Sequence, residues 1–490
     1  MLDWMPTLSP FSVVLIPFIG AALIALSAGR PFLRDLFCWL TPIPFFIAVL
    51  GQLPDVIAGT GGSQALIALL PGLEIGFAIK PLGMMFALLA STLWLLATPY
   101  ALGYLKHGGY SNIGRFMACY AIALGAAAGI AFSENLLTLY IFYEILSIST
   151  YPLVAHSGDK TSRDGARTYI GLLLVTSVGL MLPAMVWIWQ ATGTLSFTSG
   201  GILGGSALSP AAGALLLVLL LFGIGKAALM PFHRWLPAAM VAPTPVSALL
   251  HAVAVVKAGV FSVLTVVLYI FGLDYIVTLA THPIMLYLAV FTMLAASLVA
   301  IQQDNLKARL AYSTVSQLAY IVTGALLAVD LAAIGGGMHM LMHGFGKITL
   351  FFCAGAIYLG SGIKTISAMD GLGRRMPVTM IAFFIGALCV IGLPPTGGFW
   401  SKLYLVTGAW SAGHYVVVVA FMLSTLLNIG YLLPPVMRAF LKPPADEQKI
   451  AKATEAPLLC LIPLSLTALG TIVLFFAAGA AFNLLAPGIP

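Results

Sequence analysis

Residues 339–357 read HMLMHGFGKITLFFCAGAI, an apolar run of helical length that contains two histidines and a lysine. His339, His343 and Lys347 are spaced four residues apart, so on an α-helix they share one face over about 12 Å. A charged side chain at the centre of a bilayer costs about 2.5–3.5 kcal/mol, and such residues usually face an interior path or a partner. This stretch therefore predicts a membrane helix whose polar face is directed into the protein.

The whole chain has the composition of a membrane protein. Of its 490 residues, 61% are hydrophobic and only 8% are charged, and the mean hydropathy is +1.06. Soluble domains are roughly 25% charged, so this composition excludes a soluble globular protein, a disordered chain and a nucleic-acid-binding protein. We predict an all-α polytopic membrane protein of about fourteen transmembrane helices.

Each predicted span is an apolar run close to the length that crosses a bilayer. The predicted spans are residues 8–28, 36–52, 81–104, 116–132, 135–155, 168–190, 211–230, 244–270, 284–301, 309–328, 331–359, 378–403, 412–437 and 457–486. Residues 53–80 hold a shorter apolar run, which we expect to be re-entrant or interfacial. We expect no cleavable signal peptide, because the first run is long enough to span and lacks a basic segment before it.

The loop charges separate by side when the loops are assigned alternately to the two faces of the membrane. One set of loops, the basic-loop side, carries most of the 22 Lys and Arg residues. The other set, the acidic-loop side, carries Lys80 together with Asp3, Asp55, Glu74, Glu134, Asp274 and Asp330. The positive-inside rule then predicts a bacterial cytoplasmic membrane protein with both termini on the periplasmic side. The net charge of +7 is thereby explained by orientation rather than by an anionic ligand.

Glu144, in NLLTLYIFYEILSISTYPLV, is the one carboxylate that we place deep in the membrane. It is either a member of a structural ion pair or a protonatable site that tunes a nearby lysine. His251 and Lys257, in APTPVSALLHAVAVVKAGVF, lie six residues apart, or about 9 Å along a helix. They are not on one stripe, yet both can border one polar interior; the alternative for His251 is an ordinary core histidine.

Two of the spans are interrupted beside a lysine. Lys226 lies in LLLFGIGKAALMPFHRWLP and Lys402 in VIGLPPTGGFWSKLYLV. The helix-breaking residues are Gly223, Gly225 and Pro231 near Lys226, and Pro394, Pro395 and Gly398 near Lys402. Freed backbone groups in a membrane need water or a protein partner, and paired interrupted spans are typical of transporters built from inverted repeats. The alternative for Lys226 is a side chain that extends to the membrane surface, and the alternative for Lys402 is a lysine at the membrane interface.

Sequence patterns for bound cofactors are missing. The two histidines of HMLMH lack a third ligand and a glutamate, so we expect no zinc site. The five cysteines form no CxxC pair and are expected to be small core residues. There is no glycine-rich phosphate loop and no haem or iron–sulfur spacing, so we predict neither a metal nor a cofactor. A titratable line across a membrane fits a proton relay better, because histidine titrates near neutrality.

Five ordered blocks resemble the antiporter-like proton-channel subunits shared by respiratory complex I, membrane-bound hydrogenases and Mrp Na⁺/H⁺ antiporters. The blocks, between about residues 115 and 405, are NLLTLYIFYEILSISTYPL, GKAALMPFHRWLPAAMVAPTPVSALLHAVAVVKAG, LKARLAYSTVSQLAY, HMLMHGFGKITLFFCAG, and DGLGRRMP followed by GLPPTGGFWSK. The chain length looks most similar to the Mrp D subunit or to the medium-sized complex I subunits.

The resemblance implies two inverted five-helix repeats with discontinuous helices. The expected divisions are residues 1–115 (helices 1–3), 116–270 (helices 4–8, the first repeat), 284–437 (helices 9–13, the second repeat) and 457–486 (the last helix). Residues and resemblance together give a predicted proton pathway of Glu144, Lys226, His251, Lys257, Lys307, His339, His343, Lys347 and Lys402. Lys307 enters this pathway because it matches the family's lysine before the AYS motif.

We predict a proton-translocating subunit of a multi-subunit complex, and first the D subunit of an Mrp-type monovalent cation/proton antiporter. One alternative is a proton-pumping subunit of a redox-driven complex, NADH–quinone oxidoreductase or a membrane-bound hydrogenase; another is an inert scaffold subunit. Whether the chain is part of an enzyme depends on that choice. The expected partners are homologous antiporter-like subunits, other membrane subunits, lipid, H⁺ and, for an antiporter, Na⁺. The sequence leaves open the coupled ion and the direction of transport.

Overall fold

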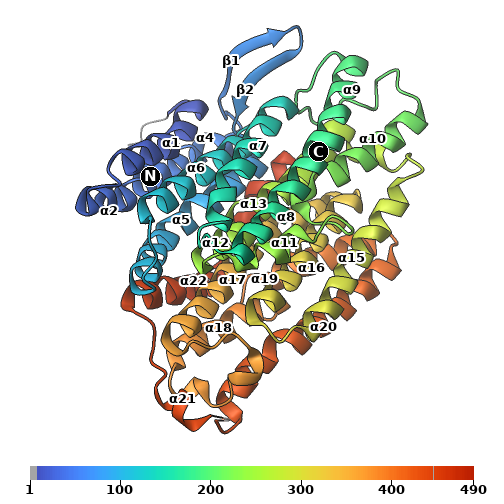
Figure 1. Ribbon diagram of the computed structural model, residues 1–490. Coiled ribbons are helices and arrows are strands. Elements are labelled where there is room, and N and C mark those ends of the chain that lie inside the picture. The colour runs from blue at the N-terminus through green and yellow to red at the C-terminus, as the bar shows by residue number, and fades with distance from the viewer. Residues whose placement is uncertain (1–7, 445, 490) are drawn as a thin grey trace.

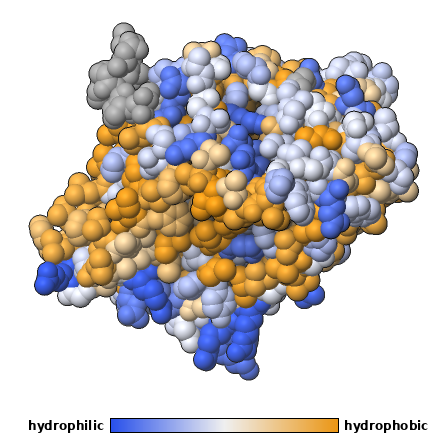
Figure 2. Space-filling view, turned by 90° about the horizontal axis from the view of Figure 1, so that it is seen from above, coloured by the Kyte–Doolittle hydropathy of each residue, from blue (hydrophilic) through white to orange (hydrophobic). Residues whose placement is uncertain are grey.

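The computed structural model describes residues 8–444 and 446–489, with the side chains of Leu250 and His251 outside the description. Among the described residues, nine helices are long and apolar enough to cross a membrane, and four shorter apolar helices accompany them. Every predicted span contains helical structure, and the spans 211–230 and 378–403 are interrupted by non-helical residues. The predicted class, a helical polytopic membrane protein with discontinuous helices, is confirmed. Figure 2 shows a broad hydrophobic band on the surface between separate hydrophilic patches.

The N-terminal part contains five helices and a hairpin, and most of these elements are labelled in Figure 1. The elements are α1 (Pro10–Leu26), α2 (Pro31–Leu40), α3 (Pro42–Gly51), α4 (Leu53–Ile57), β1 (Ser63–Leu70), β2 (Leu73–Ala78) and α5 (Pro81–His107). Prolines stand at the first turn of each of these helices, where the missing N–H costs no helical hydrogen bond.

Residues 53–80 form the short helix α4 and an antiparallel hairpin, which the sequence did not predict. Ser63 pairs with Ala78 and Leu70 with Leu73, so the turn is formed by Pro71 and Gly72. The hairpin projects beyond the helices at one end of the molecule (Figure 1). Its base is held by hydrogen bonds from the Ala78 N–H to the Phe132 carbonyl and from the Glu134 N–H to the Gly76 carbonyl. Strand pairing satisfies the backbone of this apolar stretch outside the helical bundle.

The middle of the chain holds short and interrupted helices. The elements are α6 (Ile113–Ala131), α7 (Leu136–Val154), α8 (Lys160–Thr176), α9 (Leu182–Thr192), α10 (Pro210–Gly223), α11 (Trp235–Ala238), α12 (Thr244–Ala248), α13 (Val255–Val266) and α14 (Leu273–Ile276). Three π-helical turns, Ser177–Met181, Leu249–Val253 and Val267–Phe271, lie between or after these helices. Such turns mark places where the regular backbone hydrogen-bond ladder is shifted.

The second half contains the longest helix of the described chain. The elements are α15 (His282–Gln302), α16 (Leu306–Leu326), α17 (Asp330–Ser361), α18 (Pro377–Ile391), α19 (Gly398–Ser411), α20 (Tyr415–Leu441), α21 (Glu447–Ala451), α22 (Leu458–Phe476) and α23 (Ala478–Leu485). The apolar window of α17 is completely buried. Helices α5, α13, α16, α18, α19 and α22 all pack against it, so α17 is the central helix of the bundle.

The two helix breaks have a local cause. Helix α10 ends at Gly223 and is followed by a single 3₁₀ turn, Gly225–Ala227. Helix α18 ends at Ile391, and the next residue, Gly392, has φ +90°, a conformation that favours glycine. Helix α19 then starts at Gly398, where an added Cβ would lie 1.8 Å from the Cys389 carbonyl oxygen.

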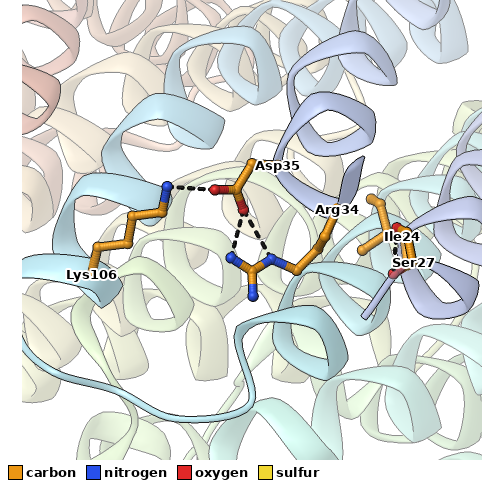
Figure 3. Close-up of polar contacts among 5 residues, drawn as sticks. All are labelled: Ile24, Ser27, Arg34, Asp35 and Lys106. Atoms are coloured by element: carbon orange, nitrogen blue, oxygen red, sulfur yellow. Dashed lines mark hydrogen bonds and ion pairs between the residues drawn. The ribbon is translucent and has the colours of Figure 1, made fainter. Parts of the chain in front are cut away.

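An ionic cluster joins the first helices to the basic-loop end of α5 (Figure 3). The Arg34 guanidinium donates two hydrogen bonds to Asp35 Oδ1, at 2.9 and 2.7 Å, and the Lys106 ammonium donates to Asp35 Oδ2. The Lys106 side chain is 48% exposed, so solvent screens its part of the cluster. The contact fixes α2 beside α5 without reaching the bundle core.

Replacing Gly398 by alanine tests the close approach at the second break. The Cβ would meet a backbone carbonyl, which cannot rotate away, so we expect a loss of about 1–3 kcal/mol of stability. The control is Gly171→Ala in α8, where no atom lies within 4 Å of the new Cβ and helix propensity favours alanine by about 1 kcal/mol. Thermal unfolding in detergent should show a lower Tm for the first variant only; equal values would contradict the packing argument.

Candidate functional site

Six buried basic side chains lie in or beside the central helix, and we call them the lysine–histidine line. Its members are Lys226, Lys257, His343, His339, Lys347 and Lys402. Their exposed fractions run from 0% to 7%. An unpaired charge buried in apolar surroundings is costly, so such groups need hydrogen-bond partners within the protein. The partners define what this site can do.

Lys226 lies in the 3₁₀ turn after α10 and is bound by one turn of α7. Its Nζ donates to the Tyr143 carbonyl at 2.8 Å and to Ser147 Oγ at 2.6 Å. The same ammonium stands 3.1 Å from the centre of the Tyr143 ring, in a cation–π contact. Its backbone N–H donates to the Tyr143 hydroxyl at 3.0 Å. The helix break thus frees the backbone of Lys226 to bind the same tyrosine as its side chain.

Glu144 follows Tyr143 on α7 and makes no direct contact with Lys226. Both carboxylate oxygens are buried, and neither has a hydrogen-bond partner among the described residues. In the same part of the chain, no ion pair within 4.0 Å joins Glu144 to a lysine. The structure therefore places a carboxylate next to the tyrosine that binds Lys226, but not in contact with the lysine itself.

Lys257 and His343 form the direct link between α13 and α17. Lys257 Nζ lies 2.6 Å from His343 Nδ1. Because a hydrogen bond needs one lone pair, the two groups cannot both be fully protonated at these atoms. The His343 Nε2 atom is buried without a partner in the described structure. This pair therefore joins two bases by one hydrogen bond.

Helix α13 also lies against the break that holds Lys226. A Cβ added at Gly259 would come within 2.2 Å of the Lys226 carbonyl carbon. Only glycine allows this approach of the two backbones. Lys257, two residues earlier in α13, is thereby placed near the turn of Lys226, although no hydrogen bond between their side chains is present among the described contacts.

His339 continues the line from His343 one turn along α17. The two imidazole rings are stacked with centroids 5.7 Å apart. His339 Nδ1 lies 2.9 Å from Ser401 Oγ of α19, and Nε2 lies 3.1 Å from Gln317 Oε1 of α16. Both ring nitrogens therefore have partners on neighbouring helices, which fixes the ring plane.

Lys402 is reached from Gln317 through Asn428 of α20. The Asn428 amide is satisfied when its oxygen accepts from Gln317 Nε2 at 3.0 Å and from Lys402 Nζ at 2.9 Å. Lys402 Nζ also donates to the Ile391 carbonyl at 3.1 Å and lies 4.5 Å from the centre of the Tyr320 ring. The end of α18 thus supplies an acceptor that an unbroken helix would have used internally.

Lys347 shares the polar face of α17 but is bound away from the other members. Its Nζ donates to Ser313 Oγ at 2.6 Å and to the Leu310 carbonyl at 3.2 Å, both on α16. The structure therefore places Lys257, His343 and His339 next to one another in that order. Lys402 is connected to His339 through the side-chain amides of Gln317 and Asn428. Lys226 and Lys347 lie beside this sequence with hydroxyl partners of their own.

Lys307 lies apart from the line, at the wall of a cavity of about 600 Å³ between the ends of several helices. Its Nζ donates to the Ala242 carbonyl at 2.6 Å. Other lining residues include Tyr104, Tyr110, Asp159, Thr244 and Tyr358. His251 belongs to the π-helical turn Leu249–Val253 that follows α12, and its side chain is outside the described residues. The cavity reaches Thr244 at the start of α12.

The neutral polar partners were missed by the sequence analysis. They are Tyr143, Ser147, Ser313, Gln317, Ser401 and Asn428. The usable signal was a polar residue inside an apolar span, such as Gln317 in AYSTVSQLAY or Asn428 in LSTLLNIGYLL. Spacing within one helix cannot show which other helix such a residue meets.

Metal binding has no structural support in the part of the chain that the structure describes. No group of three or more His, Cys, Asp or Glu side chains lies there in a position to hold a metal ion. The five cysteines are all free thiols.

The fold and the site define a class: a polytopic membrane protein with interrupted helices and titratable groups at their breaks. Residues 133–428 match the family described as NADH:quinone oxidoreductase/Mrp antiporter, TM. The chain belongs to this family, which confirms the resemblance seen in its sequence blocks. It is an antiporter-like membrane subunit of the Mrp or complex I-like type.

Relatives of both types are similar to this chain. NADH-quinone oxidoreductase subunit N of Desulforudis audaxviator (strain MP104C) is 33% identical over 422 residues, which cover 82% of each protein. The A subunit of the Na(+)/H(+) antiporter of Alkalihalophilus pseudofirmus (strain ATCC BAA-2126 / JCM 17055 / OF4) is 31% identical over 527 residues, covering 100% of this chain and 62% of that protein. The chain spans about half the length of other curated relatives, 49% in the case of NAD(P)H-quinone oxidoreductase chain 5 of Synechocystis.

Two solved structures share the fold over nearly the full length. A chain of the Mrp complex from Dietzia sp. DQ12-45-1b superposes with a TM-score of 0.88 at 21% identity, covering 98% of this chain and 97% of that chain. A chain of the membrane-bound sulfane sulfur reductase, an archaeal respiratory membrane complex, gives a TM-score of 0.87 at 23% identity, with 98% and 96% covered. Both neighbours are parts of multi-subunit membrane assemblies.

Ser147→Ala tests the solvation of the Lys226 ammonium. The change removes an acceptor from a buried charged group, so we expect a loss of about 1.5–3 kcal/mol. The matched control is Ser149→Ala on the same helix, where the lost hydroxyl bonds only the Leu146 carbonyl within its own helix. Thermal unfolding of the purified protein measures both.

A double-mutant cycle separates the contact from other effects of the substitution. In a Lys226→Met background, Ser147→Ala should cost much less than in the native chain, because no charge then needs the hydroxyl. Equal costs in the two backgrounds would contradict the assigned role of Ser147.

Proposed function

We propose that this chain carries protons across the membrane along the lysine–histidine line, in the role of the D subunit of an Mrp-type monovalent cation/proton antiporter. The observation that carries the proposal is the 2.6 Å contact between Lys257 Nζ and His343 Nδ1. Two bases that share one proton can pass it on when a second proton arrives, because both cannot stay charged in contact. No bound cofactor is needed for this exchange.

The path in this proposal runs from the basic-loop side to the second helix break. Protons enter through the cavity that holds Lys307 and reach the region of His251 and Lys226. Lys257, His343 and His339 then carry them along α17, with Lys347 beside them. Gln317 and Asn428 connect His339 to Lys402 by hydrogen bonds of 3.1, 3.0 and 2.9 Å. Amide groups relay a proton only through reorientation or water, so this connection is the slow part of the path.

Glu144 acts in this proposal as the switch on Lys226. Its buried carboxylate has no hydrogen-bond partner in the described structure, so its charge acts on Lys226 through space rather than through a fixed bond. A charged carboxylate favours the ammonium form of the lysine, and neutralising or moving it releases the proton. A change of one pKa unit corresponds to about 1.4 kcal/mol, so a small movement of one charge is sufficient.

The arrangement of the chain in its assembly is part of the same proposal. The two interrupted helices, each with a lysine at the break, support inverted repeats over residues 116–270 and 284–437. The loop charges support termini on the periplasmic side. Relatives of this chain are named as subunits of antiporters and quinone oxidoreductases, so we propose homologous antiporter-like subunits, other membrane subunits and lipid as its neighbours.

A redox-driven complex is the second candidate. It is favoured by the 33% identity to an NADH-quinone oxidoreductase subunit N over 82% of both chains. The same lysine–histidine line would serve either complex, because the driving reaction would occur in other subunits. We place the antiporter first because the WLPAAMVAPTPVSALLH and GKAALMPFHRW blocks look closer to Mrp subunits.

Lys257→Met removes the hydrogen-bonded pair of bases while keeping an unbranched side chain that is only one heavy atom shorter. We expect proton movement by the complex to fall by at least about tenfold, since the relay loses one of its two contacting bases. The measurement is a pH-sensitive dye in proteoliposomes that contain the intact complex. Lys452→Met, at an exposed position, is the control. Unchanged proton movement in the Lys257 variant would refute the assignment.

The polypeptides that remain bound after mild detergent extraction distinguish the two complexes. An antiporter assembly should contain only membrane subunits, and its loss should make growth sensitive to salt. Flavin or iron–sulfur subunits in the same particle would select the redox-driven complex instead. Identification of the bound subunits by mass spectrometry decides between them.

A further inference from the structure

Asn428 of α20 is a buried amide that lies between Lys402 and Tyr431. The side chains of Asn428 and Tyr431 are both 0% exposed, so the amide hydrogens and the oxygen lone pairs depend on protein partners. In an amide only the oxygen accepts a hydrogen bond and only the nitrogen donates one. The direction in which the Asn428 amide points is therefore decided by which of its neighbours are donors.

A first arrangement of the amide directs its oxygen toward Lys402. The oxygen accepts from Lys402 Nζ at 2.9 Å and from Gln317 Nε2 at 3.0 Å. The nitrogen donates to the Ser424 carbonyl at 3.1 Å and to the Tyr431 hydroxyl. Because an ammonium group only donates, a charged Lys402 requires this arrangement.

A second arrangement, in which the amide oxygen and nitrogen exchange places, has a donor of its own. The Tyr431 hydroxyl then donates to the Asn428 oxygen, and the amide nitrogen faces Lys402 Nζ. A neutral amine offers that nitrogen a lone pair, whereas an ammonium group offers none. The Ser424 carbonyl would lie beside an oxygen instead of a donor, so this arrangement depends on the hydrogen bond from Tyr431.

Gln317 of α16 has to turn together with Asn428. In the first arrangement its Nε2 donates to Asn428, and its Oε1 lies 3.1 Å from His339 Nε2. After both amides have turned, the Gln317 oxygen accepts from Asn428 and its nitrogen faces the His339 ring. The second arrangement therefore fits a neutral Lys402 together with a His339 Nε2 that carries no proton.

Tyr431 connects the Asn428 amide to Lys347 on the central helix. Its hydroxyl forms side-chain hydrogen bonds with Ser313 and Ser297, and Ser313 Oγ accepts from Lys347 Nζ at 2.6 Å. A charged Lys347 donates to Ser313, and the Ser313 hydrogen then points to the Tyr431 oxygen. The Tyr431 hydrogen is left for the Asn428 oxygen. A neutral Lys347 accepts from Ser313, so that Tyr431 donates to Ser313 instead.

We propose that the Asn428 amide is a two-position switch, turned by Tyr431, that favours a proton on either Lys347 or Lys402 but not on both. This inference rests on the proposed function, in which the two amides form the slow connection. Arrival of a proton at Lys347 turns the Tyr431 hydroxyl toward the amide oxygen, and the amide nitrogen then replaces the oxygen beside Lys402. Lys402 releases its proton toward the acidic-loop side, while the amide itself only rotates and neither gains nor loses a proton.

The other groups that act on Lys402 leave the switch without a fixed counter-ion. These groups are Cys389 of α18, Tyr320 of α16, and His339, His343 and Lys347 of α17. Lys347 faces Lys257 in addition. None of these described groups is a carboxylate, and nearby positive charges oppose a second proton. The orientation of the amide adds to this opposition.

Tyr431→Phe removes the donor of the second arrangement and leaves the first, because the Asn428 nitrogen keeps the Ser424 carbonyl. The loss of one hydrogen bond should slow proton movement by about two- to tenfold in proteoliposomes of the intact complex. The rate–pH profile should also shift by about 0.4–1 pH unit to higher pH, because Lys402 then keeps its proton more firmly. A purely structural role lowers the rate without moving the profile, so an unmoved profile would overturn the proposal.

Tyr100→Phe is the matched control, since this buried hydroxyl donates to the Phe352 carbonyl at 2.8 Å, outside the line. Its rate and its pH profile should remain native, and a shift equal to that of Tyr431→Phe would contradict the assignment. Thermal unfolding of both variants shows that each is folded.

Ser313→Ala tests the connection to Lys347 without changing the amide. The rate should fall, and the double variant with Tyr431→Phe should be no slower than Tyr431→Phe alone, because both changes interrupt one chain of hydrogen bonds. Losses that multiply would overturn the single chain. Thr314→Val is the control, since the Thr314 hydroxyl bonds the Leu310 carbonyl of its own helix.

The outcomes separate the switch from the function on which it rests. A native complex without proton movement would refute the proposed function. Native rates and profiles in Tyr431→Phe and Ser313→Ala, together with an inactive Lys257→Met variant, would overturn the switch alone.

Discussion

Four lysine side chains of the lysine–histidine line lie inside an apolar bundle, and hydrogen bonding of their Nζ atoms by protein atoms is the constraint on which the rest of the structure depends. In an apolar interior, the free-energy cost of burying a charge without hydrogen bonds is larger than the stabilisation that a few packing contacts provide. Each Nζ accordingly meets at least one hydroxyl, carbonyl or imidazole atom within 3.1 Å. These atoms come from α7, α16, α17 and α18, so the positions of four helices relative to one another follow from the needs of a few side chains.

The helix breaks provide part of this solvation. A continuous helix uses its own carbonyls, whereas the last turn of an interrupted helix leaves them free. The Ile391 carbonyl at the end of α18 binds Lys402, and the turn after α10 lets the backbone and side chain of Lys226 bind Tyr143 together. The glycines that allow these breaks also allow close packing, as Gly259 shows where α13 touches the turn of Lys226. The helix breaks therefore supply backbone groups that bind the buried lysines Lys226 and Lys402.

The helical spans and most charged members of the site were accessible from the sequence, because apolar length and a lone charge within it are local signals. The hairpin at residues 63–78 was not, since a short apolar run has the same composition in a strand, a re-entrant loop or an interfacial helix. The partners were not accessible either. Nothing in the local sequence distinguishes Ser147 and Asn428 from other polar residues. They become partners of Lys226 and Lys402 only because α7 and α20 pack beside segments that are far away in the chain.

Among the described residues, the line from Lys257 through His343 and His339 to Lys402 contains no carboxylate, and this determines how it could hold protons. Like charges a few ångströms apart repel by roughly 4 kcal/mol at an effective dielectric constant of 20, so every proton added weakens the binding of the next. This repulsion would act between the stacked rings of His339 and His343, and between His343 and Lys257, because these groups are neighbours. Glu144, the acid that the described structure places near the line, lies next to Tyr143, the residue that binds Lys226. In the proposed relay, a line without fixed counter-ions would not trap a proton at one position, and the direction of movement would be set by what controls its two ends.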